Sequence, residues 1–178
     1  GGSGNGATPE FPEGSLMAEL ADAGVLRVGT KFDQPGFGQV NLDGVPEGFD
    51  VEIAKIIAAE LGISEDNIEW TEAPSAVREE LLERDEVDIV VATYTINSDR
   101  KERIDFAGPY YMAGQHIMVL ADNDEITGPE SFESGEYTVC TVQGSTPSEN
   151  IRPYLANEGE QLVRFDVYSR CVDAPEAG

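Results

Sequence analysis

Apolar runs of strand length alternate with segments of helical spacing in the first half of the chain, and this alternation constrains the fold more than any other feature. The order β-α-β-α-β is typical of a parallel sheet with right-handed crossovers, so we expect an α/β fold. The strand runs are GVLRVGT (24–30), NIEWTEA (67–73) and EVDIVVAT (86–93), and the helical segments are DVEIAKIIAAELG (50–62) and SAVREELLERD (75–85).

Both helical segments start with residues that commonly cap helices. Asp50 precedes the first apolar residue of the periodic pattern, and Gly62 ends that pattern. Ser75 stands at the same place before the second segment. We therefore predict that Asp50 and Ser75 are N-caps. Residues 86–93 are almost continuously apolar, which is typical of a strand buried on both faces of a parallel sheet.

A second α/β unit is predicted to begin near residue 115. Its pattern of strands and helices continues to the last residue, and Thr146, Pro147 and Glu149 indicate a capping box at a helix start. The predicted strands are QHIMVLAD (115–122), YTVCTVQG (137–144) and QLVRFDV (161–167), with an acidic, linker-like connection at 123–136.

The sequence thus predicts four segments. Residues 1–14 are Gly-rich and indicate a flexible tether. Residues 15–110 form a first lobe, residues 111–114 a hinge, and residues 115–178 part of a second lobe. We expect the chain to stop before the second lobe closes.

The charge of the chain excludes some partners. With 35 acidic and 11 basic residues, the net charge is −24, which would repel nucleic acid and an anionic membrane surface. The single histidine, His116, lies in an apolar run, and no pattern of ligand spacing indicates a metal or another cofactor. Cys140 and Cys171 are either buried thiols or a disulfide.

Cations follow the strand ends of the predicted sheet. Lys31 follows the first strand, Arg78 lies shortly after the second, and Arg100 comes after the third. Ligands of open parallel sheets bind beyond the carboxyl ends of the strands, so these residues predict an anion site between the two lobes. The segment QGST (143–146) before a helix start would add backbone N–H groups. The alternative is that Arg78, beside several glutamates, is an ordinary solvated charge.

The segments GTKFDQPGFG (29–38), GFDVEIAKIIAAELG (48–62) and VDIVVATYTINSDRKERIDFAGPYY (87–111) resemble the extracellular solute-binding proteins of polar amino-acid ABC transporters. Within that family, GTKFDQPG and APSAVREELL are most similar to the glutamate/aspartate branch. The resemblance implies a type II periplasmic-binding-protein-like fold of two lobes, here truncated before the second lobe closes and the chain returns to the first. It also implies a binding protein rather than an enzyme.

The resemblance also implies roles for individual residues. Arg100 would bind the α-carboxylate of the ligand through two parallel hydrogen bonds. Arg78, with Ser75 and Lys31, would bind the side-chain carboxylate of glutamate or aspartate. The remaining ligand contacts would come from the hydroxyl of Thr95, the backbone at Ala92 and Thr93, the second-lobe residues Ser145 and Thr146, and Tyr168.

Partners and location follow from the same resemblance. The bound amino acid would be delivered to the membrane permease of an ABC transporter. The protein would lie outside the cytoplasm, in the periplasm or at the cell surface, with contact to the membrane only through an N-terminal lipid anchor. For such a location we expect Cys140 and Cys171 to form a disulfide.

Two other functions remain open at this point. A receptor domain that senses amino acids would use the same capture of a ligand. A dehydratase-like enzyme on the same fold would need a positioned acid or base, and no nucleophile–base pair is evident. The family's acidic partner for the ligand ammonium is expected beyond Gly178.

Overall fold

The computed structural model describes residues 9–174, which divide into two compact units. Unit 1 contains residues 9–73 and 80–94, and unit 2 contains residues 74–79 and 95–174. Residues 1–8 of the predicted tether lie outside the described residues. The predicted division into lobes 15–110 and 115–178 with a hinge at 111–114 stays a prediction.

Unit 1 is built on a three-stranded parallel sheet with the order β5-β1-β6. This arrangement confirms the parallel α/β pattern expected from the sequence. A second, antiparallel sheet of short strands has the order β2-β3-β4. The elements are α1 (Leu16–Ala23), β1 (Leu26–Thr30), β2 (Asp33–Gln34), β3 (Gly38–Val40), β4 (Pro46–Glu47), α2 (Phe49–Glu60), a 3₁₀ turn (Glu65–Asn67), β5 (Ile68–Glu72), α3 (Arg78–Glu83, whose first two residues belong to unit 2) and β6 (Ile89–Val90).

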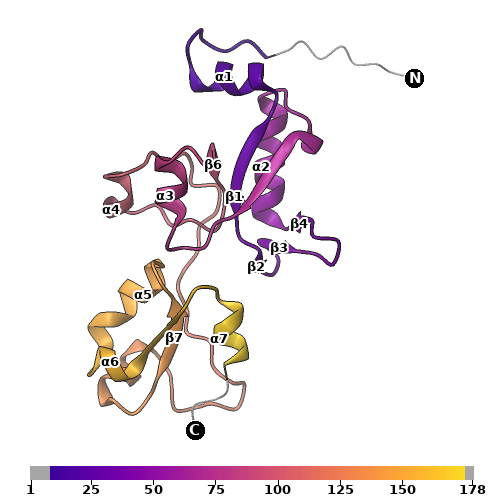
Figure 1. Ribbon diagram of the computed structural model, residues 1–178. Coiled ribbons are helices and arrows are strands. Elements are labelled where there is room, and N and C mark those ends of the chain that lie inside the picture. Colours follow the sequence, from indigo (N-terminus) through magenta and orange to yellow (C-terminus); the bar gives the residue numbers. More distant parts are fainter. Residues whose placement is uncertain (1–8, 175–178) are drawn as a thin grey trace. The chain divides into compact units, whose positions relative to one another are not determined.

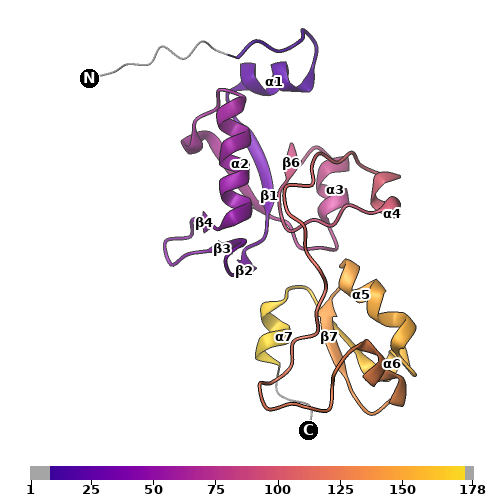
Figure 2. The same ribbon diagram turned by 180° about the vertical axis from the view of Figure 1, so that it is seen from behind.

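Helix α2 runs along the β5-β1-β6 sheet, as Figures 1 and 2 show from opposite sides. Its buried face follows from apolar residues three and four apart, among them Ala54 and Ala58, which pack with Leu26 and Val28 of β1. All four of these side chains are fully buried. This core fixes β1, so it also fixes the strand end that precedes Lys31.

The predicted role of Asp50 as an N-cap is wrong. Helix α2 begins at Phe49, and its N-cap is Gly48, with φ 128°. A side chain at Gly48 would lie 2.4 Å from the carbonyl oxygen of Phe37, so glycine is required there for space as well as for conformation. Asp50 is instead buried inside the helix, where its carboxylate is available for a longer-range contact.

The second predicted helix, over residues 75–85, and the third predicted strand, over residues 86–93, are shorter than expected. Helix α3 begins at Arg78, so Ser75 lies three residues before it and is not its N-cap. Only Ile89 and Val90 of the run 86–93 form a strand. The backbone leaves the sheet after Val90 and reaches a left-handed conformation at Thr93, with φ 47°.

Unit 2 has a two-stranded parallel sheet formed by β7 and β8. Figure 1 shows α5 and α7 on opposite sides of β7. The core contains Phe132, Ile151 and Leu162. The elements are α4 (Ser98–Lys101), a 3₁₀ helix (Pro129–Ser134), β7 (Val139–Val142), α5 (Thr146–Ile151), a 3₁₀ turn (Arg152–Tyr154), α6 (Glu158–Gln161), β8 (Leu162–Phe165) and α7 (Ser169–Asp173).

A disulfide joins Cys140 of β7 to Cys171 of α7, which confirms the predicted pairing. The two cysteines are 31 positions apart in the sequence, and their Cα atoms lie 5.6 Å apart. The bond therefore ties the last described helix to the sheet of unit 2.

Three predictions for this half of the chain need correction. No strand forms over residues 115–122, where Met118 and Leu120 are exposed, because no described strand pairs with this segment. The acidic stretch 123–136 is more than a linker, since its Phe132 is buried in the core. The N-cap of α5 is Ser145 rather than Thr146, and its hydroxyl accepts a hydrogen bond from the N–H of Ser148 at 3.2 Å.

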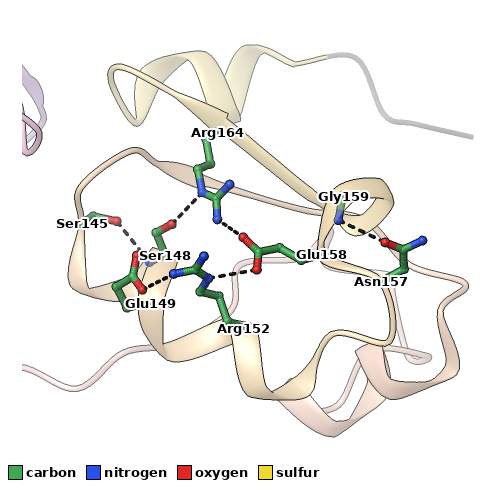
Figure 3. A network of polar contacts seen from close by, with 8 residues as sticks. All are labelled: Ser145, Ser148, Glu149, Arg152, Asn157, Glu158, Gly159 and Arg164. Atoms are coloured by element: carbon green, nitrogen blue, oxygen red, sulfur yellow. Dashed lines mark hydrogen bonds and ion pairs between the residues drawn. The ribbon is translucent and has the colours of Figure 1, made fainter.

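Charged side chains connect α5, the 3₁₀ turn Arg152–Tyr154, α6 and β8 of unit 2, as Figure 3 shows. Glu158 accepts hydrogen bonds from Arg152 and Arg164, at 3.0 and 2.5 Å. Arg152 also pairs with Glu149 at 2.6 Å, and Arg164 donates to the hydroxyl of Ser148 at 3.0 Å. These contacts lower the pKa of Glu158, chiefly through the hydrogen bond from Arg152. The network holds α5, α6 and β8 together.

Over residues 9–174, none of the helices combines the length and the apolar character that crossing a bilayer would require.

Candidate ligand-binding site

The predicted site residues fall into two groups, one in each unit. Unit 1 contains Lys31, Ala92 and Thr93. Unit 2 contains the other seven, which are Ser75, Arg78, Thr95, Arg100, Ser145, Thr146 and Tyr168.

Thr93 is held in an unusual backbone conformation by side chains from two other segments of unit 1. A positive φ is rare for a β-branched residue, because its side chain crowds the backbone. The carboxylate of Asp50 accepts a hydrogen bond from the N–H of Thr93 at 2.7 Å, and the hydroxyl of Thr93 donates to Gln34 at 2.9 Å. Strained conformations that are held in this way concentrate at functional sites. A contact between Thr93 and a ligand stays a prediction.

Lys31 directly follows β1 and is almost completely buried, with 1% of its surface exposed. Its ammonium forms an ion pair with Asp33 at 2.7 Å. The structure thus places a paired cation at the end of β1. A direct contact between Lys31 and a ligand stays a prediction.

Arg78 is the first residue of α3, and only 3% of its surface is exposed. The alternative in which Arg78 is an ordinary solvated charge is therefore wrong. A cation is disfavoured at the start of a helix, where the peptide dipoles leave partial positive charge. Ser75, three residues earlier, is also buried.

Arg100 connects four segments of unit 2. Its Nε donates to Glu79 at 3.1 Å, one terminal nitrogen donates to the carbonyl of Thr95 at 2.8 Å, and the other donates to the carbonyl of Gly144 at 3.1 Å. The first terminal nitrogen also lies 3.3 Å from the hydroxyl oxygen of Thr146. The structure therefore brings together Thr95, Arg100 and Thr146, three of the residues predicted from the sequence.

Gly144 makes this arrangement sterically possible. Its φ is 73°, and a Cβ at this position would lie 2.8 Å from the Cα of Ala76. The turn at QGST therefore approaches the segment before α3 more closely than any residue with a side chain would permit.

Two predicted residues take part in other contacts. The hydroxyl of Ser145 caps α5 and lies 3.4 Å from that of Thr141. Tyr168 is half-buried and precedes α7, where its carbonyl accepts the N–H of Cys171 at 2.9 Å. Their contacts with a ligand stay predictions.

Sequence reasoning missed the side chains that hold the predicted ones. Asn97 caps α4 by accepting the N–H of Arg100 at 2.9 Å, and the short run NSDRK carried a signal for this cap. The contacts of Glu79 with Arg100 and of Asp50 with Thr93 span 21 and 43 positions, so no local pattern indicated them. In the part of the chain that the structure describes, no group of three or more His, Cys, Asp or Glu side chains is arranged to hold a metal ion.

Comparison with known proteins identifies the family. Residues 26–167 match the model of bacterial extracellular solute-binding proteins, family 3. The chain belongs to this family. The fold resemblance agrees, since the chain superimposes with a TM-score of 0.76 on an ancestral arginine-binding protein bound to glutamine, at 33% identity, over 84% of this chain and 64% of that one. An arginine-bound form of ArgBP from T. maritima gives a TM-score of 0.78 at 29% identity, over 90% of this chain and 72% of that one.

Named relatives bind related amino acids. The chain is 42% identical to the glutamate-binding protein GluB of Corynebacterium glutamicum over 159 residues, which are 87% of this chain and 53% of GluB. It is 35% identical to a glutamine-binding protein of Geobacillus stearothermophilus, over 92% of this chain and 62% of that protein. The chain thus spans little more than half the length of these relatives. These comparisons confirm the predicted family and an α/β periplasmic-binding-protein-like fold.

Proposed function

We propose that the protein binds an acidic amino acid, glutamate or aspartate, and delivers it to the membrane permease of an ABC transporter. The family and the similarity to GluB support an amino-acid ligand. The main observation that supports an acidic ligand is the burial of Arg78 at the first position of α3. A ligand carboxylate beside this guanidinium would add a negative charge at a buried cation, and it would offset the unfavourable place of that cation at the helix start.

In this proposal, the buried residues Arg100 and Arg78 bind different groups of the ligand. Arg100 binds the α-carboxylate, which every amino acid has, and Thr95 and Thr146 beside it add hydroxyl groups. Arg78, with Ser75, binds the distal carboxylate, which glutamine lacks. Lys31, the backbone of Ala92 and Thr93, Ser145 and Tyr168 are the remaining ligand contacts that we propose.

The proposed location is outside the cytoplasm, in the periplasm or at the cell surface, with an N-terminal lipid anchor as the only membrane attachment. Membership in a family of extracellular proteins supports this location. The Cys140–Cys171 disulfide supports it as well, because such bonds persist mainly in oxidising compartments.

A calorimetric screen of the common L-amino acids against the full chain tests the proposal. We expect glutamate or aspartate to bind most tightly, with glutamine and arginine weaker. Tightest binding of a neutral or basic amino acid would contradict the acidic ligand, even though the family would still hold.

A further inference from the structure

Glu79 is a buried acid whose carboxylate contacts Arg100. The two residues are 9% and 8% exposed, and Oε1 of Glu79 accepts the Nε hydrogen of Arg100 at 3.1 Å. A carboxylate loses hydration when it is buried, so such a group needs a charged or hydrogen-bonding partner. Here that partner is the guanidinium to which the proposed function assigns the α-carboxylate of the ligand.

The contacts of Arg100 differ in strength from one edge of its guanidinium to the other. The Nε edge faces the charged Glu79, and a hydrogen bond between two charged groups is stronger than one to a neutral acceptor. The terminal nitrogens instead meet the neutral acceptors Thr95, Gly144 and Thr146, at 2.8 to 3.3 Å. A ligand carboxylate would therefore exchange more readily with these neutral partners than with Glu79.

The backbone of Arg100 is also fixed. Asn97 accepts its N–H at 2.9 Å as the N-cap of α4. Asn97 thus holds the backbone of Arg100 and Glu79 holds its Nε, so the side chain would lose less conformational freedom when a ligand binds.

Glu79 and Arg78 are adjacent at the start of α3. Consecutive residues of an α-helix project about 100° apart, so their side chains do not face each other. The first two residues of α3 would therefore serve different functions, with Arg78 facing the distal carboxylate and Glu79 facing Arg100.

We propose that Glu79 is a positioning residue that holds the guanidinium of Arg100 by its Nε edge, so that both terminal nitrogens are presented to the α-carboxylate of an amino acid. This inference rests on the proposed function. A carboxylate in this place also lowers the positive charge that the ligand meets, so the orienting effect has to outweigh that repulsion. The sign of the change in affinity distinguishes the two effects.

The test compares Glu79→Gln and Glu79→Leu with the wild-type full chain, using calorimetry with L-glutamate and L-glutamine. Glutamine keeps an acceptor for Nε without the charge, whereas leucine removes both. We expect the affinities for both ligands to fall by the same factor, about tenfold in Glu79→Gln and about a hundredfold in Glu79→Leu. Glu80→Gln is the matched control, because it removes the same charge from the next residue, whose ion pair is with Arg84. It should leave both affinities unchanged.

A second arm tests whether Glu79 acts through Arg100. In an Arg100→Lys background, which lacks the Nε edge, Glu79→Gln should change the affinity by less than about twofold. Unchanged or tighter binding in both Glu79 variants would overturn the inference, as would a changed glutamate-to-glutamine ratio or a full effect in the Arg100→Lys background. Failure of the wild type to bind either amino acid would instead overturn the proposed function, and this inference with it.

Discussion

The two compact units are stabilised by different means. Within residues 9–174, the main core of unit 1 contains eight buried apolar residues packed between its sheet and α2, whereas the core of unit 2 contains three. Unit 2 has in addition the described disulfide and the charged network around Glu158. Apolar packing suffices for a sheet covered by a long helix, while a two-stranded sheet with short helices gains stability from cross-links and ion pairs.

The largest expected effect comes from removing the disulfide. A Cys140→Ser/Cys171→Ser double variant should destabilise unit 2 by roughly 3–4 kcal/mol, because the unfolded chain is no longer closed into a loop. Hydrogen exchange of amides in β7 and β8 measures this change. Trp70, the only tryptophan, lies in β5 of unit 1 and reports that unit separately. An equal loss in the Trp70 transition would contradict the separate stabilisation of the units.

A cavity in the core of unit 1 should have the converse effect. Leu26→Ala removes a fully buried side chain, so we expect a loss of about 3 kcal/mol in the urea unfolding transition followed by Trp70 fluorescence. Leu42→Ala is the matched control, since Leu42 is fully exposed. If Leu26→Ala accelerates exchange in β7 as much as in β1, the two units unfold as one and the comparison fails.

A smaller change is expected from the contact that holds Thr93. Asp50→Asn keeps an acceptor for the N–H of Thr93 but loses its charge, so unit 1 should lose about 1 kcal/mol in urea unfolding. Glu52→Gln, on the exposed face of the same helix, controls for the charge change. Equal stability of the two variants would show that the Asp50 carboxylate does not stabilise Thr93.

The smallest effect concerns the pH dependence of unit 2. The folded-state pKa of Glu158 lies below its ordinary value of 4.5, so its ion pairs stabilise the unit fully above pH 4.5 and are lost as the pH falls through the lower folded value. Exchange of β8 amides from about pH 6 to about pH 3 should show this loss in the wild type and less of it in Glu158→Gln. Identical pH profiles would mean that the network contributes nothing measurable.

The strands and helices of the first sheet could be predicted because apolar periodicity reports burial directly. The disulfide could be predicted from a family resemblance and an expected compartment. The burial of Arg78 could not be predicted, because an arginine beside several glutamates is also the usual pattern of a solvated helix. The sequence could not distinguish Ser145 from Thr146 as the N-cap of α5, because adjacent hydroxyl residues give the same signal. Glu79 and Asp50 stabilise residues far away in the chain, and a single sequence carries no pattern for such pairs.

The central claim is that Arg78 recognises the distal carboxylate of an acidic ligand, and the ratio of glutamate to glutamine affinity tests it most directly. The ratio is measured by calorimetry in the wild-type full chain, in Arg78→Ala, and in Arg84→Ala, an exposed arginine of the same region. Arg78→Ala should lower the affinity for glutamate by roughly two to three powers of ten, because the ligand carboxylate would be buried without its partner. The difference between the affinities for glutamate and glutamine should become smaller. Arg84→Ala should leave the ratio unchanged. A glutamate-to-glutamine ratio in Arg78→Ala equal to that of the wild type would contradict the acidic-ligand assignment.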